Sequence, residues 1–189
     1  MKTTLILITS LFLSSKLFSQ TVWTTDQHHS QLHFSAIHFG IAHIAGVFHE
    51  FKVSMKCEKE DFSDAQIEMI ADVNSIDTQV EMRDNDLKGP NWFDAKKFPE
   101  LVFKNTSFTK VKNNKYKLKG NITIHGVSKP IELDVIFNGQ AVTMSKKQTA
   151  GFTVRGKLNR SDFSLGKDPM LTGVSNEIEV WADVEIGKN

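Results

Sequence analysis

Apolar and polar residues alternate along most of the chain. From residue 47 onward, apolar residues occupy the odd-numbered positions Val47, Phe51, Val53 and Met55. The polar positions are Glu50, Lys52, Ser54 and Lys56, and His49 is the exception. This alternation is typical of a strand with one face buried and the other in water.

The same pattern predicts further strands in the rest of the chain. The clearest cover residues 116–124, 131–138, 152–159 and 178–186, and weaker ones cover 23–25, 31–37, 66–73 and 101–109. In the last clear strand, Trp181 is an apolar residue on the polar side. We therefore expect an all-β fold of about eight to nine strands. Antiparallel strands with one apolar face close into a barrel or stack as a sandwich, and alternation alone does not choose between them.

One stretch has helical spacing. Val80, Arg83, Asp84 and Leu87 fall on neighbouring turns of a helix from Asp77 to Leu87, and Asp77 is placed to cap its start. An irregular turn over residues 89–94 follows. We therefore expect one short helical segment, around residues 77–95, beside the strands.

Small residues lie in the apolar phase of several strands. They are Ala71, Gly120, Gly156 and Ala182. If the strands form a barrel, missing side chains at these positions leave room for a small ligand. Glycines also mark bends or bulges that curve a sheet, and the two interpretations are compatible.

The first residues differ from the rest. Met1-Lys2 is followed by about ten mostly apolar residues, too short for a membrane span and typical of a secretory signal. We expect a signal peptide over residues 1–19, cleaved before Gln20 or Thr21, and one domain over residues 20–189. No cysteine lies near the cleavage point, so we expect no lipid anchor. The protein is predicted to be exported, to the periplasm or out of the cell.

Composition narrows the class of protein. Hydrophobic residues make up 40% and charged residues 24% of the chain, as in one soluble globular domain rather than a disordered or multi-pass membrane protein. The net charge is +1 and no run of Lys or Arg exceeds two, which argues against a nucleic-acid partner. The single cysteine, Cys57, cannot form an internal disulfide.

The residues that carry chemistry indicate no catalytic or metal site. Six histidines lie within 22 residues: His28, His29, His33, His38, His43 and His49. Only His29 and His33 share a strand face, and no third ligand of matching phase stands beside them, so we expect no metal. Nucleophile elbows and phosphate-binding glycine loops are absent from the sequence. Arg83-Asp84 would suit a carboxylate or pyrophosphate head group, or is a pair that ties down a loop.

Seven segments together resemble the YceI-like family, the polyisoprenoid-binding, lipocalin-like exported proteins of bacteria. The segments are Trp23–Phe34, His38–Ile41, Gly46–Phe51, Ser75–Leu87, Phe98–Phe103, Gly120–Pro130 and Asn159–Phe163, in the family's order. Two positions depart from the family pattern. Asp86 stands where the family often has histidine, and Asn91-Trp92-Phe93 replaces a more usual acidic-Phe-Phe run.

The resemblance implies an extended antiparallel lipocalin-like β-barrel of about eight strands around a long apolar tunnel. It implies a non-enzymatic protein that carries or sequesters a long-chain amphipathic lipid (polyisoprenoid, quinone-like or fatty-acyl), without cofactor or membrane anchor, and a homodimer. About ten residues per strand at roughly 3.3 Å rise and about 40° tilt give a lumen near 25 Å long. We expect the tunnel wall to include Phe34, Phe51, Val53, Phe103, Ile122, Phe152 and Val180. We expect His38, Arg83 and Asp84 near the head group.

Two other functions stay open at this point. The first is an enzyme that acts on such a lipid with His38 and Asp84 as an acid–base pair. The second is a solid barrel whose exposed Trp181 face docks a protein partner.

Overall fold

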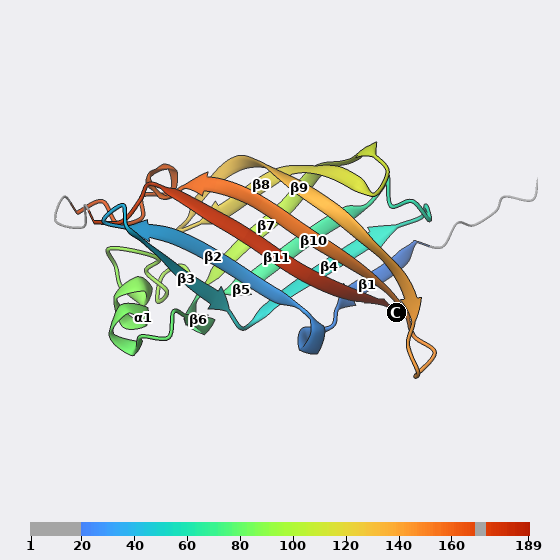
Figure 1. The fold of residues 1–189 in the computed structure, drawn as a ribbon, viewed down its shortest axis with the longest axis horizontal. Coiled ribbons are helices and arrows are strands. Elements are labelled where there is room, and N and C mark those ends of the chain that lie inside the picture. The colour runs from blue at the N-terminus through green and yellow to red at the C-terminus, as the bar shows by residue number, and fades with distance from the viewer. Residues whose placement is uncertain (1–19, 169–172) are drawn as a thin grey trace, which may run out of the picture.

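The computed structural model describes residues 20–168 and 173–189 (Figure 1). The predicted signal segment, residues 1–19, lies outside the described residues. The strands are β1 (Thr21–Thr25), β2 (Gln31–His38), β3 (Ala42–Phe48), β4 (Phe51–Cys57), β5 (Gln66–Asp72), β6 (Ile76–Asp77), β7 (Glu100–Lys112), β8 (Lys115–Ile124), β9 (Val127–Val142), β10 (Gln148–Asn159) and β11 (Glu177–Lys188). The helices are α1 (Glu81–Lys88) and the short 3-10 turns η1 (Gln27–His29), η2 (Val73–Ser75) and η3 (Arg160–Phe163).

The strands form a closed antiparallel barrel. In the order β1-β4-β5-β7-β8-β9-β10-β11 each strand pairs with the next, and β11 pairs back onto β1. The remaining strands prolong this ring: β2 follows β1 along β11, β3 pairs with β2, and β6 pairs with β3. Each of the chain segments 21–38, 42–57 and 66–77 is thus one long strand with an interruption. Counted in this way, the barrel has eight strands. The predicted eight-stranded antiparallel barrel is confirmed.

The alternation predicted between residues 47 and 55 is interrupted in the structure. Phe48 is buried inside the barrel and pairs with Leu32 and Ile76, whereas Val47 pairs with His33 and Asp77 on the other face. His49 and Glu50 form a bend between β3 and β4, and Phe51 resumes the inward face. The prediction that Val47 shares a face with Phe51 was therefore wrong, because the bend shifts the phase.

The helix is shorter than predicted, and Asp77 does not cap it. β6 holds Asp77 in extended backbone opposite Val47, so the helix begins only at Glu81. The Asp77 carboxylate instead accepts hydrogen bonds from the Gln79 N–H at 2.6 Å and the His49 ring at 3.0 Å. Within residues 20–168 and 173–189, no helix is both long and apolar enough to cross a membrane.

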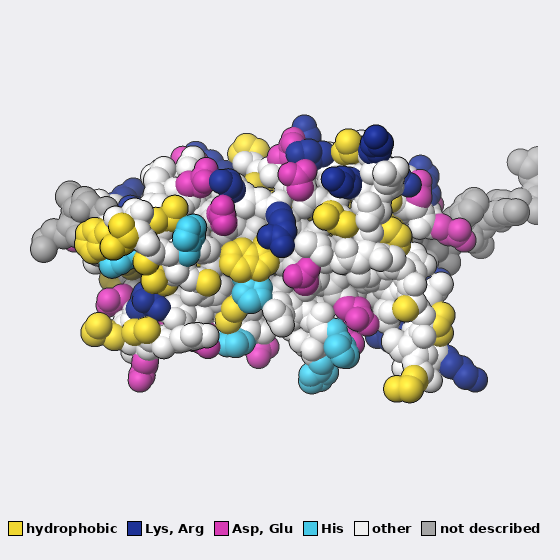
Figure 2. Space-filling model, in the orientation of Figure 1, with side chains coloured by type: hydrophobic (Ala, Val, Ile, Leu, Met, Phe, Trp, Pro, Cys, Tyr) yellow, Lys and Arg dark blue, Asp and Glu magenta, His cyan; other side chains and the backbone are white. Residues whose placement is uncertain are grey.

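The strand glycines accommodate neighbouring side chains. A Cβ placed on Gly120 would lie 2.5 Å from the Phe103 ring, and one on Gly156 would lie 2.2 Å from Leu133 Cδ2. The space expected above these glycines is therefore already filled by Phe103 and Leu133. The outer surface, by contrast, carries mixed charges along the strands (Figure 2), including Lys117 between Glu132 and Asp134 at 3.0 and 2.9 Å.

Candidate ligand-binding cavity

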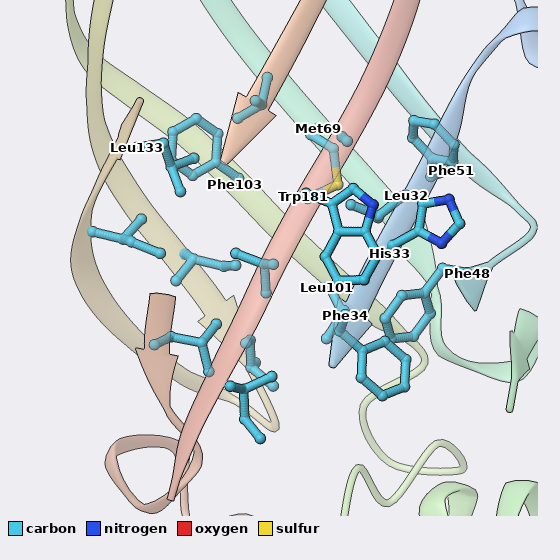
Figure 3. A pocket seen from close by; sticks show the side chains of 18 of the residues that line it. Leu32, His33, Phe34, Phe48, Phe51, Met69, Leu101, Phe103, Leu133 and Trp181 are labelled. Carbon is cyan, nitrogen blue, oxygen red and sulfur yellow. The ribbon is translucent and has the colours of Figure 1, made fainter. Parts of the chain in front are cut away.

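The barrel encloses an apolar cavity of about 420 Å³. This volume lies in the range of roughly 300–1,000 Å³ that small-molecule sites occupy. Inward side chains of nearly every strand line it, and Figure 3 shows Phe34, Phe48 and Phe51 of β2, β3 and β4 among them. The barrel is therefore hollow rather than solid.

The seven predicted wall residues all line this cavity. They are Phe34, Phe51, Val53, Phe103, Ile122, Phe152 and Val180. Alternation puts them there, since each lies in phase with other buried or cavity-lining residues of its own strand. That they contact a ligand stays a prediction.

One end of the cavity is closed by aromatic rings. Phe62, from the loop between β4 and β5, is 2% exposed, and its ring centroid lies 5.8 Å from Trp23, 5.5 Å from Phe137 and 5.6 Å from Phe152. Lining residues toward this end, such as Phe108 and Val135, are buried. Phe62 could not be predicted from the sequence, because an isolated aromatic in a polar loop carries no periodic signal.

The other end carries the polar lining and is partly open. Thr78, Arg83 and Asp86, from α1 and the segment before it, line the cavity there together with His38 and Arg160. His38 and Asp86 are exposed, and Arg83 and Arg160 are half-buried. The cavity is thus a tube with an apolar interior, one closed end and a polar mouth beside α1.

Arg83 and Asp84 both form hydrogen bonds with Thr78. Arg83 donates from Nε to Thr78 Oγ1 at 2.8 Å and from Nη2 to the Thr78 carbonyl at 2.7 Å. The buried Asp84 carboxylate accepts from the Thr78 N–H at 2.8 Å and from its hydroxyl. Asp84 is not among the cavity-lining residues, so the structure brings His38 and Arg83 to the mouth but not Asp84. Asp84 stabilises the loop before α1.

The proposed acid–base pair is not formed. In the part of the chain that the structure describes, no hydrogen bond joins His38 to Asp84. The His38 ring instead packs against Phe39, with centroids 4.3 Å apart, and its backbone bridges to Val174.

Arg160, at the start of η3, organises a second part of the mouth. Its guanidinium donates to the carbonyls of residues 165, 166, 174 and 175 at 2.8–3.2 Å, and it lies 5.6 Å from the centre of the Trp92 ring. It thereby joins the loop after β10 to the segment after α1. Beyond its place in a family motif, the role of Arg160 could not be predicted from the sequence, because its partners are backbone carbonyls of other segments.

Trp181 is less exposed than expected. It stacks on His33 of β2, with ring centroids 5.0 Å apart and planes 4° apart, and is partly buried (Figure 3). The stack covers the seam between β2 and β11, where the two residues are paired in register.

A surface cluster of Asp26, His29 and Glu185 has ligand atoms within 4.8 Å of one another. His29 Nδ1 lies 3.1 Å from the Asp26 carboxylate, which also accepts the His28 N–H at 3.0 Å. The hydrogen bond from His29 lowers the pKa of Asp26 below its usual value. These contacts account for the arrangement, and His33, the predicted companion of His29, bonds to Gln31 instead.

Known proteins resemble this chain in sequence and in fold. The family model of the YceI-like domain matches residues 23–186. Protein YceI of Salmonella arizonae is 30% identical over 140 residues, which cover 74% of this chain and 72% of that protein. The crystal structure of BcnA from Burkholderia cenocepacia superposes with a TM-score of 0.76 at 23% identity, covering 85% of this chain and 98% of that one.

A polyisoprenoid-binding domain from Saccharophagus degradans, implicated in plant cell wall breakdown, has the same fold. Its TM-score is 0.63 at 14% identity, and the match covers 88% of this chain and 98% of that domain. The family match extends from β1 to the end of the barrel, so the chain belongs to the YceI-like family.

Proposed function

We propose that this protein is an exported binding protein that carries or sequesters a long-chain amphipathic lipid, such as a polyisoprenoid, quinone-like or fatty-acyl molecule. The tail would occupy the tube, and the head group would lie at the mouth near His38 and Arg83. The polyisoprenoid-binding domain of the same fold supports this class of ligand.

The observation that carries the proposal is the distribution of polarity along one cavity. Apart from His33 on β2, the closed end and the middle are lined by aliphatic and aromatic side chains, whereas Thr78, Arg83, Asp86 and Arg160 gather at the mouth. A molecule that matches this distribution has a long apolar part and a single polar end. Burial of each methylene stabilises the complex by about 0.8 kcal/mol, so affinity requires few directional contacts.

We propose binding rather than catalysis for this cavity. His38 packs against Phe39, and Asp84 is engaged by Thr78, so the two do not form an acid–base pair at the cavity. Export is supported by the basic start and apolar stretch within residues 1–19, and would place the mature protein in the periplasm or outside the cell.

The test is to purify the protein from its native host, weigh it under native conditions, and identify by mass spectrometry what organic solvent extracts from it. We expect a stoichiometric isoprenoid or acyl lipid and a mature chain that starts at Gln20 or Thr21. An empty protein that also fails to take up a panel of such lipids would overturn the binding proposal. A chain that retains Met1 would overturn export.

A further inference from the structure

Among the residues that the structure describes, five large apolar side chains are exposed at the open end of the barrel. Ile37, Phe39 and Ile41 at the β2–β3 turn are 38, 70 and 88% exposed, and Val80 and Met82 at the start of α1 are 42 and 76% exposed. Figure 2 shows hydrophobic side chains gathered at this end, over α1 and the β2–β3 turn. We call these five side chains the apolar rim.

Both parts of the rim adjoin residues that line the mouth. Phe39 follows the lining residue His38, and its N–H donates to the Gly173 carbonyl at 2.6 Å, next to the lining residue Val174. Met82 directly precedes Arg83, which lines the cavity from α1. A surface that covered the rim would therefore also cover the opening.

The backbone fixes the outward position of the turn. Phe39 and Gly40 both have positive φ, 48° and 72°, so the chain reverses tightly and carries Phe39 and Ile41 away from the barrel. A Cβ on Gly40 would meet nothing within 4 Å. Ile41 thus projects into solvent, and the Phe39 ring stays largely exposed although it contacts the His38 ring.

We propose that the apolar rim inserts into the surface of a lipid bilayer, so that the ligand passes between the bilayer and the cavity without crossing water. This inference rests on the proposed function, because a long-chain lipid resides in a membrane and must leave it to reach the cavity. Projecting apolar side chains at the interface of acyl chains and head groups are the usual means by which a protein lies on a membrane.

The rim fits a bilayer better than a second copy of the chain. Its exposure equals about three whole side chains, or about 600 Å² at roughly 200 Å² each. That is at the upper end of the roughly 300–600 Å² that the largest exposed apolar patch of a monomer covers, an extent that often marks a functional surface. It is also divided between a turn and a helix start rather than forming one flat face.

The helix beside the rim has no excess of positive charge. α1 carries Glu81, Asp84 and Asp86 against Arg83 and Lys88. Docking would therefore depend on apolar insertion more than on attraction to anionic head groups, and salt would weaken it little.

The test measures transfer of a fluorescent polyprenol from phosphatidylethanolamine–phosphatidylglycerol vesicles to the mature protein. The rim variant carries Ile41→Ser and Met82→Ser, the two most exposed rim positions. The matched control carries Val142→Ser and Met144→Ser, which are 67 and 105% exposed on β9 and the β9–β10 loop, at the closed end. We expect the wild-type rate to rise with vesicle concentration, and the rim variant to be at least about tenfold slower while the control is unchanged.

Affinity for the same polyprenol delivered from detergent separates the two proposals. Equal affinities in all three proteins, with slow transfer only in the rim variant, would support docking. Equal transfer rates in rim and control variants, or a wild-type rate independent of vesicle concentration, would overturn docking and leave lipid binding intact. Failure of all three proteins to bind from detergent would overturn the proposed function and docking with it. A rim variant that loses only dimerisation would assign the rim to a second copy.

Discussion

Narrowing the tube should weaken lipid binding by a calculable amount. Val180 lines the cavity in the middle of β11, opposite Phe34 of β2 and Gly156 of β10, and is only partly buried because its side chain faces open space. Val180→Phe adds four carbons to the wall and should displace about four carbons of ligand. At about 0.8 kcal/mol each, the loss is about 3 kcal/mol, or about 200-fold in Kd.

The control for this variant lies one residue away on the opposite face. Glu179→Phe adds an aromatic ring to the exposed outer surface of the same strand and should leave lipid affinity unchanged. Gly120 and Gly156 are poor sites for such a test, because a Cβ there would lie 2.4 Å from the Lys104 carbonyl oxygen or 2.2 Å from Leu133 and would disturb folding.

Competition with a fluorescent lipid, alongside the thermal midpoint of each protein, measures the effect. The cavity has room for the added ring, so Val180→Phe should unfold within a few degrees of wild type. A folded Val180→Phe protein with wild-type affinity, or an equal loss of affinity in Glu179→Phe, would refute the assignment of the tube as the binding site.

Three further predictions concern stability and reactivity. Thr78→Val leaves the buried Asp84 carboxylate without a hydroxyl donor and should lower the free energy of unfolding by about 1–3 kcal/mol in urea titrations; an unchanged midpoint would contradict this role. Burial raises the pKa of the Cys57 thiol, so an aromatic disulfide reagent at neutral pH should label it only after unfolding, and rapid native labelling would contradict its burial. The hydrogen bond from His49 lowers the pKa of Asp77, so its contribution to stability is present above its usual pKa of 3.8 and is lost as pH falls through the lower folded value. Asp77→Asn should therefore lose less stability on acidification than the wild-type protein. Urea midpoints of both proteins, measured above pH 3.8 and below the lower folded pKa of Asp77, give the difference.

Alternation was a reliable guide wherever a strand runs unbroken. In β8 and β11 the alternation placed Leu118, Ile122 and Val180 on the inward face. It does so because inward and outward residues alternate along every strand of a barrel that has water outside. It failed at His49 and Glu50, where a bend without glycine or proline shifts the phase. Nothing in the local sequence marks that bend, since its hydrogen bonds run to Ser75 and Asp72.

The part of the site that lies on the strands could be predicted from the sequence. The lining of the tube follows from strand periodicity, whereas its two ends are built by loops through contacts distant in sequence. Phe62 closes one end from a polar loop, and Arg160 binds carbonyls contributed by two other segments. The Asp84 side chain likewise turns toward Thr78 because β6 fixes the segment before α1, a constraint that helical spacing does not reveal.

Because aromatic rings around Phe62 close one end of the barrel, the cavity should limit the length of lipid tail that it can bury. In a tube with one entrance, the proposed lipid tail would advance until it meets the rings, and any further carbons would stay outside in water. Affinity should thus increase by a nearly constant step for each added methylene and then level off at the length that reaches Phe62. Removal of the Phe62 ring should raise the tail length at which affinity levels off, without any change at the mouth.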